Sequence, residues 1–166
     1  MRNLCSHRKG RPTADHRLAL ALILAALTGA CTSSEASMHS VQADIGGATV
    51  SLPIPDGLVA TLMPGGLSIR RMAEGRQIHD MTLTPATGAS PVQLVQTHGT
   101  GAEAIHYGMA RSGGGSGGED VTMIAERRCG AVTLRLRLAT QADEDGPADI
   151  DQALAMLADT GCGPTE

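Results

Sequence analysis

Aromatic side chains are almost absent from this sequence. It contains no Trp and no Phe, and Tyr107 is its single Tyr. Sugar-binding clefts stack pyranose rings on aromatic side chains, and proteins that bind single-stranded nucleic acids use the same kind of platform. The composition therefore argues against direct binding of glycans, peptidoglycan included. It also means that the core is built from aliphatic residues and Met.

Positive charge is scarce after the first 30 residues. Residues 1–30 contain five of the 13 basic residues and one of the 17 acidic residues. Residues 31–166 therefore carry eight Arg, no Lys and 16 acidic residues, a formal charge of −8. A surface of this sign repels nucleic acids and anionic lipids and attracts a basic partner. The charge excludes nucleic-acid binding.

No apolar run is long enough to cross a bilayer, which takes about 20 residues. The longest run, Leu18–Leu27, follows five basic residues and is typical of the apolar region of a secretory signal. The sequence Thr28-Gly29-Ala30-Cys31 that follows has the form of a lipobox, although Thr28 stands where Leu is usual. We expect cleavage before Cys31 and a lipid on that cysteine.

Two other interpretations of this segment stay open. Ordinary signal cleavage after Ala30 or Ala36 would give a secreted protein without a lipid, and a buried core helix is opposed by Arg17. With Cys31 acylated, the protein is expected in the periplasm, and Thr32, rather than Asp, after the cysteine favours the outer membrane of a Gram-negative host.

Two cysteines remain once Cys5 leaves with the signal and Cys31 takes its lipid. In an oxidising compartment Cys129 and Cys162 are expected to form a disulfide. The alternatives are two free buried thiols or a metal site, and no further ligands stand at metal-binding spacing.

The predicted organisation is a signal peptide (1–30), a flexible tether (31–46) and one domain (47–166), because the mature chain is too short for two domains. A strand near Thr49 is expected to end at Pro53 and Pro55, followed by a turn at Asp56-Gly57. Alternating or β-prone residues predict further strands, two pairs of them as hairpins, over 65–72, 76–85, 91–98, 103–110, 119–128 and 131–140.

One helix is predicted, near the C-terminus. Asp149 is expected to cap it, an apolar stripe includes Leu154 and Leu157, and Gly161 ends it. The fold class expected from these elements is α+β: a largely antiparallel sheet with the C-terminal helix packed on one face.

Catalytic motifs are missing. The glycine-rich stretch 111–120 has no Lys for a phosphate loop and is interpreted as a mobile or partner-contacting loop. The acidic stretch 143–151 does not match the ligand spacing of a calcium loop and is interpreted as a solvated turn. His79, His98 and His106 fall on different predicted strands, and nothing pairs them with a nucleophile such as Ser51 or Ser68. The pairs Arg70-Arg71 and Arg127-Arg128 are expected to point outward. The sequence therefore predicts no enzyme.

The order of three segments resembles a known family. "VSLPIPDGL" (50–58), "IHYGMARSGGGSGGEDVTMIAERRCGAVTLRLRL" (105–138) and "ADIDQALAMLADTGC" (148–162) resemble small lipoprotein domains with a PsbP-like α/β fold. Among them, the chain is most similar to lipoprotein immunity proteins against type VI secretion muramidases, which share the "GSGGE" turn and the cysteine near the last helix. Leu58 departs from the pattern, which usually has an aromatic residue there.

The resemblance implies a periplasmic immunity protein that inserts loops into the groove of a peptidoglycan-degrading toxin, with calcium bound on the toxin side and no cofactor of its own. The alternative is a structural or assembly lipoprotein of the envelope with no toxin partner. By position, the loop residues expected to bind the partner are Asp56, Ser116, Glu119, Asp120 and Glu144.

Overall fold

Strands dominate the protein. The computed structural model describes residues 38–73, 76–115, 118–141 and 146–164. The elements in chain order are β1 (Met38–Ile45), β2 (Ala48–Pro55), β3 (Leu58–Met63), β4 (Gly66–Ala73), β5 (Arg76–Pro85), β6 (Gln96–His98), the 3₁₀ turn η1 (Gly101–Glu103), β7 (Ile105–Gly115), β8 (Gly118–Cys129), β9 (Val132–Gln141), α1 (Gly146–Ala158) and β10 (Gly161–Pro164).

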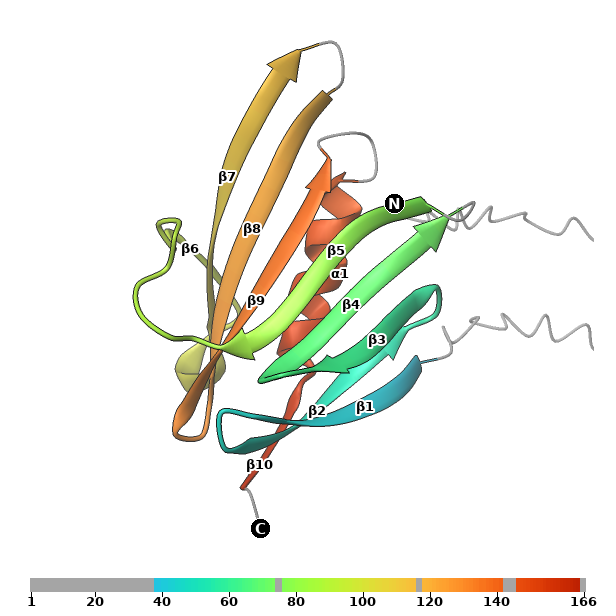
Figure 1. The fold of residues 1–166 in the computed structure, drawn as a ribbon. Helices are drawn as coiled ribbons and strands as arrows, with labels where there is room; N and C mark the ends of the chain where they lie inside the picture. Colours follow the sequence, from blue (N-terminus) through green and yellow to red (C-terminus); the bar gives the residue numbers. More distant parts are fainter. Residues whose placement is uncertain (1–37, 74–75, 116–117, 142–145, 165–166) are drawn as a thin grey trace, which may run out of the picture. The chain divides into compact units, whose positions relative to one another are not determined.

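The strands form two antiparallel sheets, as Figure 1 shows. The large sheet has the strand order β3-β4-β5-β9-β8-β7-β6, and the small one has the order β1-β2-β10. The α+β class expected from the sequence is therefore wrong: across the described residues the fold is mostly β, with two sheets and one short helix. Among the described residues, no helix is long and apolar enough to cross a bilayer.

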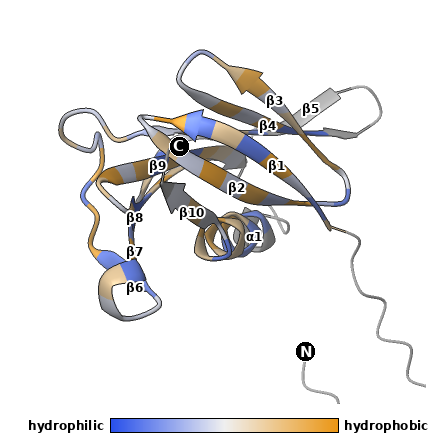
Figure 2. Cartoon of the chain, turned by 90° about the horizontal axis from the view of Figure 1, so that it is seen from below, coloured by the Kyte–Doolittle hydropathy of each residue, from blue (hydrophilic) through white to orange (hydrophobic). Residues whose placement is uncertain are grey.

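One core joins both sheets and the helix. In Figure 2, β1 and β2 lie between α1 and the β3–β4 hairpin. The period-two pattern of β9 is confirmed, because Leu134, Leu136 and Leu138 are fully buried while Arg137 is exposed. Apart from Cys129, the buried core side chains are aliphatic or Met. Those from β2, β4, β5 and α1 include Val50, Leu52, Ile54, Leu67, Ile69, Met81, Leu83, Ala153, Leu154 and Leu157.

The first strands differ from the prediction. Met38–Ile45, assigned to the tether, forms β1, which pairs with the whole of β2. β2 also continues through Pro53 and Pro55. Pro53 and Pro55 stand two residues apart, so their backbone nitrogens, which carry no hydrogen to donate, point to the same edge of β2. One edge of β2 is free at these positions, because β10 pairs with β2 only from Ala48 to Ser51. Both prolines therefore fit a stretch of β2 that has a neighbour on one side only.

The outer face of the large sheet is partly covered by the chain between β5 and β6. Arg135 donates hydrogen bonds to the carbonyl oxygens of Thr87 (3.5 Å) and Gly88 (2.9 Å). A Cβ at Gly108 would lie 1.9 Å from the carbonyl oxygen of Gln93, so only Gly permits this close approach. The predicted hairpin arm 91–98 is consequently shorter, with only Gln96–His98 paired to β7.

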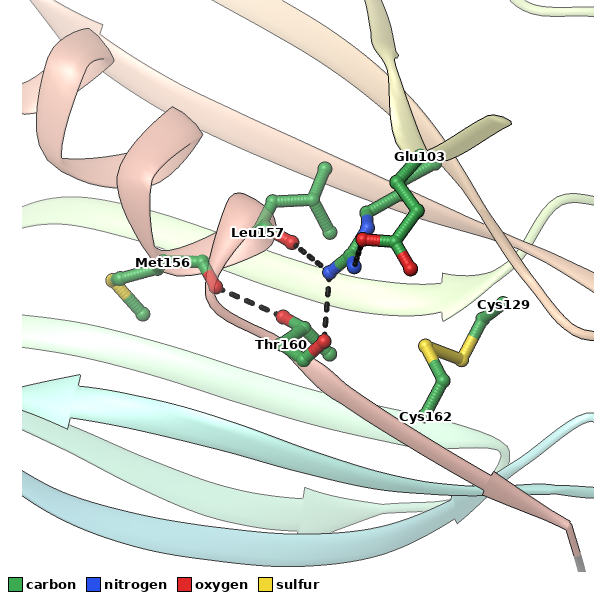
Figure 3. The surroundings of a disulfide bond; sticks show 7 residues. Glu103, Cys129, Met156, Leu157, Thr160 and Cys162 are labelled. Carbon is green, nitrogen blue, oxygen red and sulfur yellow. Dashed lines mark hydrogen bonds and ion pairs between the residues drawn. A yellow bond between two sulfur atoms is a disulfide. The ribbon is translucent and has the colours of Figure 1, made fainter. Parts of the chain in front are cut away.

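A buried arginine holds the C-terminal end of α1. Arg127, expected to point outward, is 5% exposed. Its Nη1 donates to the carbonyl oxygens of Leu157 and Thr160, each at 2.7 Å, and its Nη2 lies 3.1 Å from Glu103 Oε2 (Figure 3). Carbonyls at the end of a helix lack intrahelical donors, so a cation there satisfies them and complements the helix dipole.

The disulfide lies beside this arginine. The predicted Cys129–Cys162 bond is confirmed and joins the end of β8 to β10 (Figure 3). Closing a loop of this length stabilises a fold by about 3 to 4 kcal/mol in the chain-entropy model. Arg127 and the disulfide together fix the end of α1 and the strand that follows it.

We predict that Arg127→Met lowers the free energy of unfolding by about 3 kcal/mol. It removes both hydrogen bonds from Arg127 Nη1 to buried carbonyls, leaves the Leu157 oxygen only the 3.4 Å contact from the Thr160 N–H, and removes the partner of Glu103. The measurement is denaturant unfolding of the chain from residue 32 onward. The matched control is Arg128→Met, at an exposed position, with an expected change within about 0.5 kcal/mol. Equal effects of the two substitutions would contradict this role for Arg127.

Candidate functional site

Several turns and strand ends of the large sheet lie at one end of its strands. In Figure 1, β4, β7 and β9 end on the same side of the large sheet, where β5 and β8 begin. The turn from β2 to β3 lies at this end too, because Leu58 pairs with Arg71 near the end of β4. It contains Asp56 and Gly57, whose φ of 83° confirms the predicted turn.

Three of the predicted partner-binding residues lie at this end. Asp56 is in the β2–β3 turn, and Glu119 and Asp120 open β8; we call these three the acidic rim. The strands β4, β5 and β9 separate β3 from β8, a lateral span of roughly 20 Å at normal strand spacing. Ser116, Glu144 and the lipidation residue Cys31 lie outside the described residues.

The charges of the acidic rim differ in their surroundings. Asp56 and Asp120 are exposed, whereas Glu119 Oε2 lies 3.0 Å from Arg111 Nη1 on the neighbouring strand. The two exposed carboxylates therefore carry the negative potential, and Arg111 partly neutralises the third.

A second, partly buried network holds the start of α1. Asp149, expected as the helix cap, lies inside the first turn, because α1 begins at Gly146. Its Oδ1 accepts a hydrogen bond from Arg71 Nη1 at 3.1 Å, and its Oδ2 accepts one from Thr140 at 2.9 Å. Arg71 Nη2 also donates to Gln152 Oε1 at 2.8 Å. Arg71 thus binds the helix rather than pointing outward, and it ties α1 to β4.

A hollow of about 360 Å³ opens at the opposite end of the strands. It contains an exposed cation, Arg128, beside His106 and Glu126, and Arg135 lies 2.7 Å from the Glu126 carboxylate. The prediction of an outward Arg128 is therefore confirmed, but the sequence did not indicate the hollow. Its lining residues are Gly101, Ala102, Ala104, His106, Glu126, Arg128 and Thr133.

The histidines and serines named from the sequence do not assemble into a reactive group. His106 Nδ1 lies 3.4 Å from Thr97 Oγ1, and Ser51 Oγ lies 2.6 Å from Ser40 Oγ. His98 pairs across the sheet with Ile105, and the side chain of His79 is outside the described set. Within the described ranges, no three His, Cys, Asp or Glu side chains gather as metal ligands would.

The arrangement is that of a mostly β protein with exposed acidic side chains at one end of its large sheet. The sequence profile of the type six secretion immunity 3 domain (Tsi3) matches residues 51–160, from the middle of β2 to two residues beyond α1. The chain belongs to this family of type VI secretion immunity proteins. No curated protein matches the chain as a relative.

Membership of this family implies an inhibitor with a protein partner, the toxin effector, rather than an enzyme. It decides the choice left open by the sequence, because an envelope assembly factor without a toxin partner does not fit an immunity family. The resemblance to immunity proteins is thereby confirmed, and the PsbP-like α+β fold that came with it is not.

We predict that Arg71→Met lowers the free energy of unfolding by about 1.5 to 3 kcal/mol, since it removes two hydrogen bonds, one of them to the buried Asp149 carboxylate. Arg70→Met is the matched control. Arg70 is exposed, and its Nε lies 3.8 Å from Asp80 Oδ1, which is a weak surface ion pair. The expected loss of unfolding free energy is therefore below about 1 kcal/mol. Chemical denaturation measures both, and a larger loss for Arg70→Met would contradict this assignment.

Proposed function

We propose that this protein is a lipid-anchored periplasmic immunity protein that binds and occludes a peptidoglycan-degrading type VI secretion effector. The observation that carries the proposal is the family match over residues 51–160, which supplies the toxin partner. The wall as the toxin's target is supported by the signal and lipobox sequence ending at Cys31, because an inhibitor of a wall hydrolase has to act where the wall is.

Occlusion is the mechanism that fits the surface. The acidic rim presents two exposed carboxylates, Asp56 on the β2–β3 turn and Asp120 near the start of β8. Enzymes that act on anionic peptidoglycan often present basic surfaces, and opposite charges speed association and fix orientation. We propose that Asp56, Glu119 and Asp120, with Ser116 and Glu144 of the adjoining sequence, enter the substrate groove of the toxin and block it.

Calcium belongs to the same proposal, as an ion on the toxin's side of the interface. The immunity protein then contributes at most carboxylates that approach an ion already held by the toxin. Removing calcium would weaken the complex without changing the stability of the free immunity protein.

The primary test is a pull-down with the chain from residue 32 onward, with and without calcium, against secreted proteins of the source organism. We expect recovery of one wall hydrolase whose lytic activity disappears on mixing with the immunity protein. Recovery of a type VI effector that attacks another target would overturn the wall-degrading part of the proposal.

The rim itself is tested by charge reversal. We predict that the double substitution Asp56→Arg and Asp120→Arg weakens toxin binding by at least about tenfold at low salt, mainly through slower association. Asp159→Arg is the control, since Asp159 is an exposed acid just beyond α1 at the opposite end. Biolayer interferometry with the recovered hydrolase measures both, and equal losses would place the contact elsewhere.

The anchor gives a separate prediction. Cys31→Ser is expected to abolish incorporation of labelled palmitate and to release the protein into the soluble periplasmic fraction, because a lipid chain supplies the membrane affinity. Cys5→Ser is the matched control and should change neither result. Retention of label after Cys31→Ser would refute lipidation at this cysteine.

A further inference from the structure

The two sheets have four edge strands in the described part of the chain, β1, β10, β3 and β6. Exposed edges invite pairing with another strand, and proteins protect them with short strands, proline or polar and charged side chains. β6 has three polar residues, and β10 has four residues and ends in Pro164. β1 is longer, but it carries the polar residues His39, Ser40, Gln42 and Asp44.

β3 has little of this protection, since Thr61 is its single polar residue. Its six residues, Leu-Val-Ala-Thr-Leu-Met, include no charge and no proline. Val59 is 61% exposed, Leu62 is 66% exposed and Met63 is 36% exposed. These are three of the five large hydrophobic side chains that are exposed in the described residues. In Figure 2, β3 is the outermost strand of its sheet, and its arrowhead has the colour of hydrophobic residues.

We propose that β3 is a homodimer interface, in which β3 of two copies pair antiparallel about a two-fold axis through Thr61. An axis perpendicular to the sheet keeps the solvent face of both copies on the same side. Val59 then lies opposite Met63 of the second copy, and Ala60 lies opposite Leu62 of the second copy. Both exposed faces of the strand thus meet apolar side chains, and the two large sheets become one.

Charge selects a second copy as the occupant of this edge. The strand is neutral in a chain whose residues 31–166 carry −8, and no charged residue lies between Asp56 and Arg70. In the proposed register, no charge of one copy stands opposite a like charge of the other along β3. A basic toxin, in contrast, is complementary to the acidic rim and finds no carboxylate on this strand.

The test is site-specific cross-linking of the chain from residue 32 onward, which retains every described contact. This chain lacks Cys31, and Cys129 is bonded to Cys162, so an introduced cysteine is its single free thiol. Directly opposed residues on antiparallel strands have Cα atoms about 4.5 to 5.5 Å apart, within disulfide range. We expect Thr61→Cys to form a disulfide-linked dimer on mild oxidation.

Ser68→Cys is the matched control. Ser68 pairs with Thr61 on the neighbouring strand β4 and shares its solvent face. In the proposed dimer, two Ser68 positions lie three strand spacings apart, about 14 Å, and therefore cannot be bridged. We expect Thr61→Cys to give at least about tenfold more cross-linked dimer than Ser68→Cys.

Light scattering over a concentration series gives the independent readout. The unmodified chain should approach twice the monomer mass, and Thr61→Val should do the same. Thr61→Glu should remain monomeric with its circular dichroism unchanged, because two like charges would lie directly opposite each other. A monomeric mass throughout, equal cross-linking of the two cysteine variants, or a Thr61→Glu dimer as tight as the unmodified one would each overturn the proposal.

Discussion

The rest of the structure depends on how α1 is fixed against the large sheet, beside β2 of the small sheet. Arg71 on β4 binds the first turn of α1, and Arg127 on β8 binds the last turn of α1. Two strands, β5 and β9, lie between those attachment points, so the helix crosses the buried face of the large sheet. An aliphatic core without Trp or Phe has no broad rings to fill gaps, and close packing therefore requires a precisely positioned helix. The partly exposed Arg71 and the buried Arg127 supply that position, and the disulfide beside Arg127 extends it to β10.

Sequence patterns predicted the parts of this fold that depend on local order. Alternation identified β9 and β8, and β5 has the predicted bounds, 76–85. Three strands were not predicted. β1 is largely polar, β10 is short, and β3 is uncharged and does not alternate. Each of them forms a strand by pairing with a neighbour. The α+β class failed for the same reason: one helix was visible, and strands at both ends of the domain were not. The burial of Arg127 could have been predicted, since it continues the inward-facing series Val121, Met123 and Ala125.

The candidate site shows the same division. Each acidic turn is visible in the sequence, and the resemblance selected these turns as partner-binding loops. Their position at one end of the strands depends on strand direction and on the order β3-β4-β5-β9-β8, which the sequence does not reveal. The partners of Asp149 could not be predicted from neighbouring residues. A carboxylate near a helix start is expected to cap that helix, yet this one binds Arg71 and Thr140, residues 78 and nine positions away.

The two proposed surfaces are compatible because they differ in chemistry and direction. Pairing through β3 is antiparallel, so the strands of the second copy run opposite to those of the first, and the two acidic rims point in opposite directions. Surface charges further apart than the Debye length, about 8 Å at physiological salt, are largely screened. The rims of the two copies therefore do not repel each other appreciably, although each copy carries excess negative charge. Glu119 and Asp120 of each copy lie four strand spacings from the dimer seam. Asp56, two residues before β3, lies near the β3–β4 turn of the second copy, so a toxin that contacts Asp56 also approaches that turn.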